Sequence, residues 1–239
     1  MCSTAAIGIN IAMSGAIVQS LCGVTLVGGG ELTPAFVTDS LTIAPVLVAA
    51  DGAADALWAM GLQPEAVIGD LDSISPTCRA ALPAARLHQV AEQDTTDFDK
   101  CLRNIDAPFI IAVGFTGARI DHALACFNAL VRHPERKCLI IGPADLCFLA
   151  PLSLHLTLPP GTRLSLFPMG PVSGRSTGLR WPIDGLRFAP QRLIGTSNET
   201  DAGDVRLNFS NRRMLVILPA DCLLAALAAL GCAAEPGSP

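Results

Sequence analysis

The feature that most constrains the fold is an alternation of short apolar runs with helical segments over residues 24–142. The runs are apolar at consecutive positions, which is typical of strands buried on both faces of a parallel sheet. Helices are predicted between them at residues 52–60, 75–82, 95–105 and 121–133. We therefore expect a mainly parallel, Rossmann-like α/β domain that binds its ligands at the carboxyl ends of the strands. The runs are VTLVGG, PVLVAAD, EAVIGD, ARLHQV, FIIAVG and KCLIIG.

After about Pro151 the sequence changes to brief, partly alternating segments separated by Gly, Pro, Asn and Asp. Such a pattern predicts a smaller antiparallel β domain, a sandwich. The opening residues lack the basic start of a signal peptide, and polar residues interrupt their apolar run, so we expect a weakly ordered extension or an added helix there. The predicted division is an extension at 1–22, the α/β domain at 23–152, the β-sandwich at 153–220 and a short tail at 221–239.

Charge is distributed unevenly along the chain. No Lys or Arg precedes Arg79, so all 16 basic residues but only 14 of the 21 acidic ones lie from that position onward. An acidic first third without a basic stripe argues against nucleic-acid binding and suits a site that collects metal ions. We expect neither nucleic acid nor a membrane as a partner. Nine cysteines without a CxxC pair are interpreted as reduced, mostly buried thiols of a cytoplasmic protein.

Carboxylates follow four of the predicted strands. Because the carboxyl ends of parallel strands share one edge of a sheet, we expect these acids to meet in a single cleft. In an extended segment, side chains two positions apart point the same way, so Asp70 and Asp72 would aim at one spot. Such oxygen ligands suit Mg²⁺ with a nucleoside triphosphate. The acids are Asp51, Asp70, Asp72, Asp94, Asp97 and Asp121.

Each acid also has a simpler explanation. Asp70 and Asp72 could hold a turn. Asp94 and Asp97 have the spacing of a capping box in which Asp94 caps the helix, and Asp97 with Lys100 could be a surface ion pair. Asp121 could favour a helix N-terminus, and the neighbouring His122 could be structural. These explanations suffice one at a time, whereas the shared position at strand ends favours a metal site.

Phosphate handling also needs cations and close backbone approach. Arg119 can grip a phosphate with two hydrogen bonds, and Lys100 can act as a point charge. The glycines at 28–30 resemble a phosphate-approach loop, although they match neither common phosphate-loop motif and are equally explained as a tight turn.

With these residues assembled, the chain resembles the thiamine pyrophosphokinases. The matching stretches are LVGGGEL, VAADGAADAL, PEAVIGDLDSIS, DTTDFDKCL and GFTGARIDHALACFNAL, followed by STGLRW and GTSNET. The resemblance implies an ATP-binding α/β domain, a β-sandwich that helps to bind thiamine, and a homodimer with active sites between subunits.

Site residues follow from the same motifs. The resemblance implies metal ligands at Asp51, Asp70, Asp72 and Asp97, with Lys100, Arg119 and Asp121 as further catalytic residues. It implies ATP contacts at Gly29, Gly30, Asp51, Asp94, Arg119 and His122. Thiamine contacts are implied at Trp181, Ser197 and Asn198. A Trp face can stack on a flat, cationic heterocycle, and the alternative for Trp181 is a place in the core.

The implied reaction is Mg²⁺-dependent transfer of the diphosphoryl group of ATP to the hydroxyl of thiamine, which gives thiamine diphosphate and AMP. Two alternatives come from other classes. One is a DxD-type glycosyltransferase, which leaves STGLRW and GTSNET unexplained. The other is a non-catalytic thiamine or nucleotide sensor, against which the intact GDLDS and DTTD stretches argue. A Rossmann oxidoreductase ranks lower because no acidic residue follows a GxGxxG fingerprint at the required distance.

Overall fold

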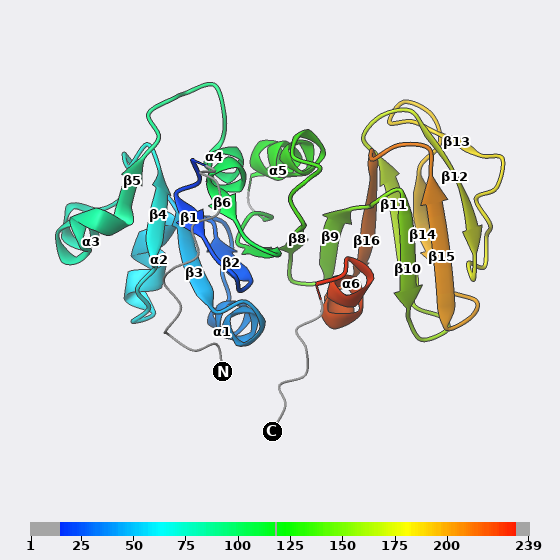
Figure 1. The fold of residues 1–239 in the computed structure, drawn as a ribbon, viewed down its shortest axis with the longest axis horizontal. Helices are drawn as coiled ribbons and strands as arrows, with labels where there is room; N and C mark the ends of the chain where they lie inside the picture. The colour runs from blue at the N-terminus through cyan, green and yellow to red at the C-terminus, as the bar shows by residue number, and fades with distance from the viewer. Residues whose placement is uncertain (1–14, 118, 233–239) are drawn as a thin grey trace. The chain divides into compact units, whose positions relative to one another are not determined.

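A computed structural model describes residues 15–117 and 119–232 of the chain (Figure 1). The described residues up to Phe115 form one compact unit, and those from Thr116 onward form a second. The predicted domain boundary at 152/153 stays a prediction. Among the described helices, none has the length and apolar character needed to cross a membrane.

The first unit is built on a parallel sheet with strand order β7-β2-β3-β4-β5. The residues of β2, β4 and β7 are buried throughout, as are all but the first of β3, so the consecutive apolar runs do mark central strands. The strands are β2 (Val24–Val27), β3 (Val46–Ala50), β4 (Ala66–Gly69), β5 (Leu87–Gln89) and β7 (Ile110–Val113). This confirms the predicted α/β fold class.

Helices connect these parallel strands, because a parallel pair cannot be joined by a tight hairpin. They are α1 (Pro34–Ile43), α2 (Ala53–Ala59), α3 (Pro76–Ala81) and α4 (Asp97–Asn104), with a 3₁₀ turn η1 (Ala84–Arg86) before β5. The sequence pattern predicted all of these helices except α1, whose Val, Thr and Ile content lowers helix propensity. Pro34 occupies its first turn, where a missing N–H costs nothing.

A short element also lies where an extension or helix was expected. Strand β1 (Val18–Gln19) pairs in parallel with β6 (Ile105–Asp106). The described part of the predicted extension is therefore partly extended chain and not helical. The expectation for residues 1–14 falls outside the described residues.

The second unit opens with α5 (Ile120–Arg132) and continues as antiparallel strands. One group has the order β14-β11-β16-β9-β8, and a separate sheet has the order β10-β15-β12-β13. The strands are β8 (Cys138–Ile141), β9 (Asp145–Leu149), β10 (Ser153–Thr157), β11 (Arg163–Pro168), β12 (Val172–Thr177), β13 (Arg187–Phe188), β14 (Gly195–Glu199), β15 (Asp204–Phe209) and β16 (Met214–Pro219), followed by η2 (Ala220–Cys222) and α6 (Leu223–Ala229).

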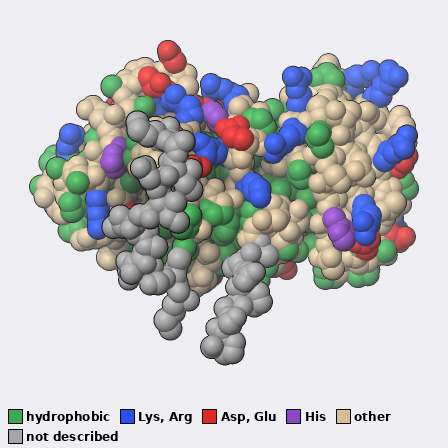
Figure 2. All heavy atoms as spheres, in the orientation of Figure 1, with side chains coloured by type: hydrophobic (Ala, Val, Ile, Leu, Met, Phe, Trp, Pro, Cys, Tyr) green, Lys and Arg blue, Asp and Glu red, His purple; other side chains and the backbone are tan. Residues whose placement is uncertain are grey.

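Alternating burial identifies the inner face of the four-stranded sheet. In β15, Val205, Leu207 and Phe209 are buried while the residues between them are exposed, and Leu154 and Leu156 repeat the pattern in β10. Their partners across the strands face the same way because the register pairs Leu154 with Leu207 and Leu156 with Val205. The antiparallel second part of the predicted fold is thereby confirmed. On the face drawn in Figure 2, Lys and Arg side chains lie over this unit in separate small groups.

Cysteine chemistry matches the expectation with one exception. Seven described cysteines are free, and all of these except Cys222 are buried. Burial raises the pKa of the Cys126 and Cys147 thiols to about 12, which leaves them protonated and unreactive at neutral pH. Cys22 is disulfide-bonded, so the prediction that all nine cysteines are reduced is wrong for this residue.

Candidate active site

Asp51 is the residue that follows β3, and it turns the chain toward α2. Its backbone adopts a left-handed conformation with φ of 43°, and its N–H donates to the Ile68 carbonyl over 3.0 Å. A Cβ at Gly69 would lie 2.6 Å from the Asp51 Cβ, so only glycine leaves room for Asp51 beside the end of β4. Close packing of the two strand ends thus directs this carboxylate toward the residues that follow β4.

The surroundings of Asp51 disfavour a negative charge on its carboxyl group because they exclude water. The residue is 3% exposed, and its Oδ1 is buried without a hydrogen-bond partner among the described residues. Burial and then the charge of Asp97 raise the pKa of Asp51, with smaller contributions from Asp70 and Asp72. A buried, unpartnered carboxylate oxygen is expected where a cation is to be bound.

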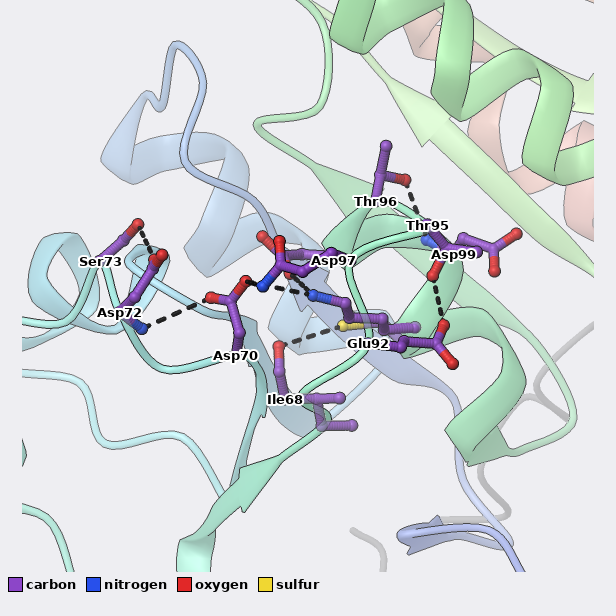
Figure 3. A network of polar contacts seen from close by, with 12 residues as sticks. Ile68, Asp70, Asp72, Ser73, Glu92, Thr95, Thr96, Asp97 and Asp99 are labelled. Atoms are coloured by element: carbon purple, nitrogen blue, oxygen red, sulfur yellow. Dashed lines mark hydrogen bonds and ion pairs between the residues drawn. The ribbon is translucent and has the colours of Figure 1, made fainter.

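Asp70 and Asp72 do converge, but the chain between them is not extended. Leu71 has φ of 64° and a buried side chain, so the backbone folds into a tight turn. The Asp72 N–H donates to Asp70 Oδ1 over 3.4 Å, and the Ser73 hydroxyl donates to Asp72 Oδ1 over 2.8 Å (Figure 3). The prediction that strand alternation aligns the two carboxylates was wrong in its geometry, although the predicted convergence is present.

These acids form one cluster at the carboxyl ends of β3 and β4. Ligand oxygens of Asp51, Asp70 and Asp72 all lie within 4.8 Å of one another. Hydrogen bonds from Gln93 and from the Asp72 N–H, together with the Lys100 charge, lower the pKa of Asp70 and outweigh the opposing effect of its desolvation. The lowered pKa keeps Asp70 ionised at neutral pH, and its oxygens lie beside those of Asp51 and Asp72 around a common point.

Asp97 begins α4, and Lys100 follows one turn later. The Lys100 ammonium group lies 3.0 Å from Asp97 Oδ1 and 3.5 Å from Asp70 Oδ2, and the side chain is 2% exposed. Burial alone would lower the pKa of Lys100, but the hydrogen bonds and charges of Asp97 and Asp70 raise it. The alternative of a surface ion pair is wrong, because Lys100 is a buried cation shared by two carboxylates.

Asp94 does not cap α4. The N-cap is Thr96, whose hydroxyl accepts a hydrogen bond from the Asp99 N–H over 3.3 Å. Asp94 is exposed two residues earlier. The predicted capping box named Asp94 as the N-cap, which is wrong. Thr and Asp are both good N-caps, and the sequence alone did not distinguish Asp94 from Thr96.

The glycine run follows β2, at the point where the strand order reverses between β3 and β7. Gly28 N–H donates to the Val113 carbonyl and Gly30 N–H to the Gly114 carbonyl, both over 2.8 Å. A Cβ at Gly28 would meet the Gly114 oxygen at 2.6 Å, whereas one at Gly29 would meet nothing within 4 Å. Gly28 is therefore needed for the close contact with the chain after β7. The backbone at Gly29 is accessible, and it lies where the strand order reverses, which is where nucleotides bind in open α/β sheets.

Three predicted residues belong to the second unit, around the start of α5. Arg119 donates two hydrogen bonds to Asp121, over 3.2 Å from Nε and 2.6 Å from Nη2, and both side chains are exposed. The hydrogen bond from Arg119 lowers the pKa of Asp121 to about 2. His122 is also exposed. Arg119 and Asp121 thus form an exposed ion pair with two hydrogen bonds, a fork-like arrangement that holds the guanidinium in one orientation.

The predicted thiamine contacts gather around β14. The Asn198 amide donates to the Trp181 carbonyl over 2.8 Å, and its Oδ1 accepts from the Trp181 N–H over 3.3 Å. Ser197 has φ of 60° and donates its N–H to Ser165. Trp181 is 53% exposed, with the Arg180 guanidinium 4.9 Å from its ring centroid. The alternative that Trp181 is a core residue is wrong.

Residues that sequence reasoning missed lie around the Asp70–Asp72 turn. Gln93 donates to Asp70 Oδ2 over 3.1 Å, and Arg79 donates to the Leu71 carbonyl over 3.2 Å. Asp55 accepts hydrogen bonds from Ser75. The Ser-Pro pair at 75–76 is a helix-start signal that indicates Ser75 as a cap, but no local pattern indicates the other contacts.

A parallel α/β unit with an acidic cluster at its strand ends, followed by an antiparallel β unit, defines an α/β protein with a candidate cation site. Residues 37–141 match the family described as thiamin pyrophosphokinase, catalytic domain, and residues 153–214 match thiamin pyrophosphokinase, vitamin B1 binding domain. The chain therefore belongs to the thiamine pyrophosphokinase family.

Individual relatives agree with this assignment. The chain is 30% identical over 167 residues to thiamine pyrophosphokinase 1 of Oryza sativa, which covers 62% of this chain and 63% of the rice protein. It is 30% identical over 159 residues to thiamine pyrophosphokinase 2 of Arabidopsis thaliana, which covers 58% of that protein. The matched segments thus span about three-fifths of these curated relatives.

Solved structures share the fold. A protein from Lactobacillus plantarum superposes with a TM-score of 0.69 at 26% identity, over 83% of this chain and 98% of that one. Yeast thiamin pyrophosphokinase superposes with a TM-score of 0.71 at 16% identity, over 89% of this chain and 94% of that one.

Proposed function

We propose that this protein is a thiamine diphosphokinase that transfers the diphosphoryl group of ATP to the hydroxyl of thiamine and releases AMP. Membership of the family supports the activity, as does the presence of both matched regions in one chain. The observation that carries the proposal is the convergence of Asp51, Asp70 and Asp72 oxygens within 4.8 Å of one another. Diphosphoryl transfer depends more on neutralising phosphate charge than on covalent help from the protein, and a cation held by these carboxylates would supply that neutralisation.

The residues present fit Mg²⁺ as the cofactor. Mg²⁺ binds through carboxylates, waters and substrate phosphates, and the cluster offers carboxylates only. The buried, unpartnered Asp51 Oδ1 gains a partner when a cation is bound. Bound Mg²⁺ supplies positive charge to phosphate oxygens. We propose Asp51, Asp70 and Asp72 as its ligands, with Asp97 completing the acidic set.

Lys100 acts on this site through its neighbours. Since its ammonium group is buried between Asp97 and Asp70, we infer that it fixes both carboxylates and offsets their repulsion. The expected contact of Lys100 with phosphate stays a further proposal, because two carboxylates leave one of the three ammonium donors available.

Further residues are proposed to contact ATP. Gly29 is proposed to present its backbone N–H to phosphate, and Gly30, whose N–H donates to the Gly114 carbonyl, to lie beside ATP. Asp94 and His122 are also proposed to contact ATP. Arg119 is proposed to grip phosphate oxygens, with Asp121 holding its guanidinium in orientation.

Thiamine binding is assigned to the second unit. Trp181 is proposed to stack on the cationic heterocycle, because its ring is half exposed and its backbone is held by Asn198. Ser197 and Asn198 are proposed to provide polar contacts. A homodimer with active sites between subunits, and a cytoplasmic location, are further proposals that rest on the family resemblance and on the free cysteines.

The test is an assay of the purified protein with ATP, Mg²⁺ and thiamine, followed by chromatography. We expect thiamine diphosphate and AMP in equal amounts, dependent on both thiamine and Mg²⁺. Binding of both ligands without AMP would identify a sensor, and ADP as the product would show transfer of a single phosphoryl group. Either result overturns the proposal.

A further inference from the structure

The turn that carries Asp70 and Asp72 is held from outside by a second pair of residues. We infer that Asp55 and Ser75 are positioning residues for cation binding, which lock the end of this turn in the conformation that brings the carboxylates together. The inference rests on the metal site of the proposed function.

Asp55 lies on α2 and reaches the start of α3. Its Oδ2 accepts from the Ser75 N–H over 2.9 Å, and its Oδ1 accepts from the Ser75 hydroxyl. The same hydroxyl accepts from the Cys78 N–H over 3.2 Å and so caps α3. Ser75 is therefore held at both its backbone and its side chain, three residues beyond Asp72.

The turn needs such a restraint because Leu71 is strained. A left-handed conformation is unfavourable for a branched side chain and persists only where the surroundings enforce it. Three contacts enforce it here: Leu71 is buried, Arg79 donates to its carbonyl over 3.2 Å, and Ser75 is tied to Asp55. Without the tie, the segment can relax toward extended chain, which moves Asp72 away from Asp70.

The contact between Asp55 and Ser75 also connects the two segments that carry the proposed cation ligands. Asp51 directly precedes Gly52, the N-cap of α2, and Asp55 lies in the first turn of that helix. A Cβ at Gly52 would lie 3.0 Å from the Ser73 Cβ, so the start of α2 and the turn are already in close contact. Asp55 thus joins the element that positions Asp51 to the turn that positions Asp70 and Asp72.

The experiment measures Mn²⁺ affinity of the full chain by electron paramagnetic resonance, without ATP or thiamine. Asp55→Ala and Ser75→Ala should each weaken Mn²⁺ binding about tenfold, the lower end of the loss seen when an outer-shell partner of a metal ligand is removed. The double variant should bind about as weakly as the weaker single variant, because both changes break one contact. Asp39→Ala, an exposed acid on α1, controls for lost charge and should stay within about twofold of wild type.

Stability is measured in parallel, because loss of the α3 cap alone could lower the melting temperature. If Asp55→Ala does not fold, Asp55→Asn decides the question, since its amide oxygen can still accept one of the two hydrogen bonds. Asp55→Asn should bind Mn²⁺ more weakly than wild type and more tightly than any folded alanine variant.

Two results separate the possible failures. In the first, wild type binds Mn²⁺, Asp72→Asn does not, and Asp55→Ala binds like wild type. The positioning role is then wrong and the metal site stands. If Asp55→Ala does not fold, wild-type binding by Asp55→Asn leads to the same conclusion. If wild type does not bind Mn²⁺, the metal site itself is wrong and the positioning role falls with it.

Discussion

The Lys100 ammonium group lies 3.0 Å from Asp97 Oδ1 within α4, and the same ammonium group reaches Asp70 Oδ2 over 3.5 Å. One buried cation thus joins a carboxylate from the start of a helix to a carboxylate from the end of a strand. Such a cation makes it possible for acids to gather before any metal is bound, because it offsets part of their mutual repulsion.

Lys100→Met tests this role. The substitution keeps most of the apolar volume but leaves Asp70 and Asp97 without their shared cation. Because Asp97 is partly exposed, we expect a loss of about 2 kcal/mol in the free energy of unfolding, below the 3–5 kcal/mol typical of a fully buried pair. Added Mg²⁺ should restore part of the loss. Urea unfolding with and without Mg²⁺ measures both effects, and unchanged stability in the absence of Mg²⁺ would contradict the assignment.

Asp72→Asn tests the metal cluster. The substitution keeps the shape of the side chain and removes one negative charge from the cluster. Turnover at saturating Mg²⁺ should fall at least about tenfold, since a lost ligand costs at least as much as a lost outer-shell partner. Asp39→Asn, at an exposed position of α1, is the matched control. Turnover of Asp72→Asn within about twofold of wild type would remove Asp72 from the site.

Asp51→Asn should stabilise the metal-free protein while abolishing its activity. Burial and the charge of Asp97 raise the pKa of Asp51, so the folded state binds a proton more readily than the unfolded state does. Ionised Asp51 therefore lowers stability at neutral pH, and the neutral amide removes that cost. In EDTA, calorimetry should give a higher Tm for the variant at neutral pH.

The difference in Tm should shrink as the pH falls toward the ordinary value of 3.8, because wild-type Asp51 then becomes protonated as well. A lower Tm for Asp51→Asn at neutral pH would mean that Asp51 has a stabilising partner and is not a preorganised cation ligand.

The pair of Arg119 and Asp121 predicts a specific titration. The hydrogen bond from Arg119 holds the pKa of Asp121 at about 2, so the favourable interaction is complete above the ordinary value of 3.8 and is lost as the pH falls through about 2. Arg119→Gln should return the pKa of Asp121 toward 3.8. Carboxyl ¹³C NMR measures this shift. An Asp121 that titrates at its ordinary pKa in wild type would show that the fork does not persist in solution.

Trp181→Ala should affect thiamine far more than ATP. Loss of a cation–π contact worth roughly 1–1.4 kcal/mol raises the KM for thiamine up to about tenfold and leaves the KM for ATP within about twofold. Because Trp181 is half exposed, the Tm should change little. Trp58→Ala on α2, which is 40% exposed, is the matched control. Equal effects on both KM values would exclude a thiamine-specific role for Trp181.

Part of the site follows from sequence pattern because strand and helix order is a local property. The apolar runs ending at Ala50 and Gly69 mark strand ends, so Asp51 and Asp70 could be assigned to the same sheet edge before any coordinates were known. Helix α1 was missed because its β-branched residues weaken the helical pattern. Strands β9, β10 and β12 were also missed, since short antiparallel strands carry weak individual signals.

The sequence by itself determined the alternation of strands with helices α2, α3 and α4 in the first unit, the antiparallel character of the second unit and the acids that follow the strands, because each depends on periodicity and on neighbours along the chain. Only the tertiary structure decided how those acids meet. The left-handed turn at Leu71, the burial of Lys100 between two carboxylates and the contact of Asp55 with Ser75 join residues 2 to 30 positions apart. Such contacts are set by the packing of strands and helices against one another, which no local pattern specifies.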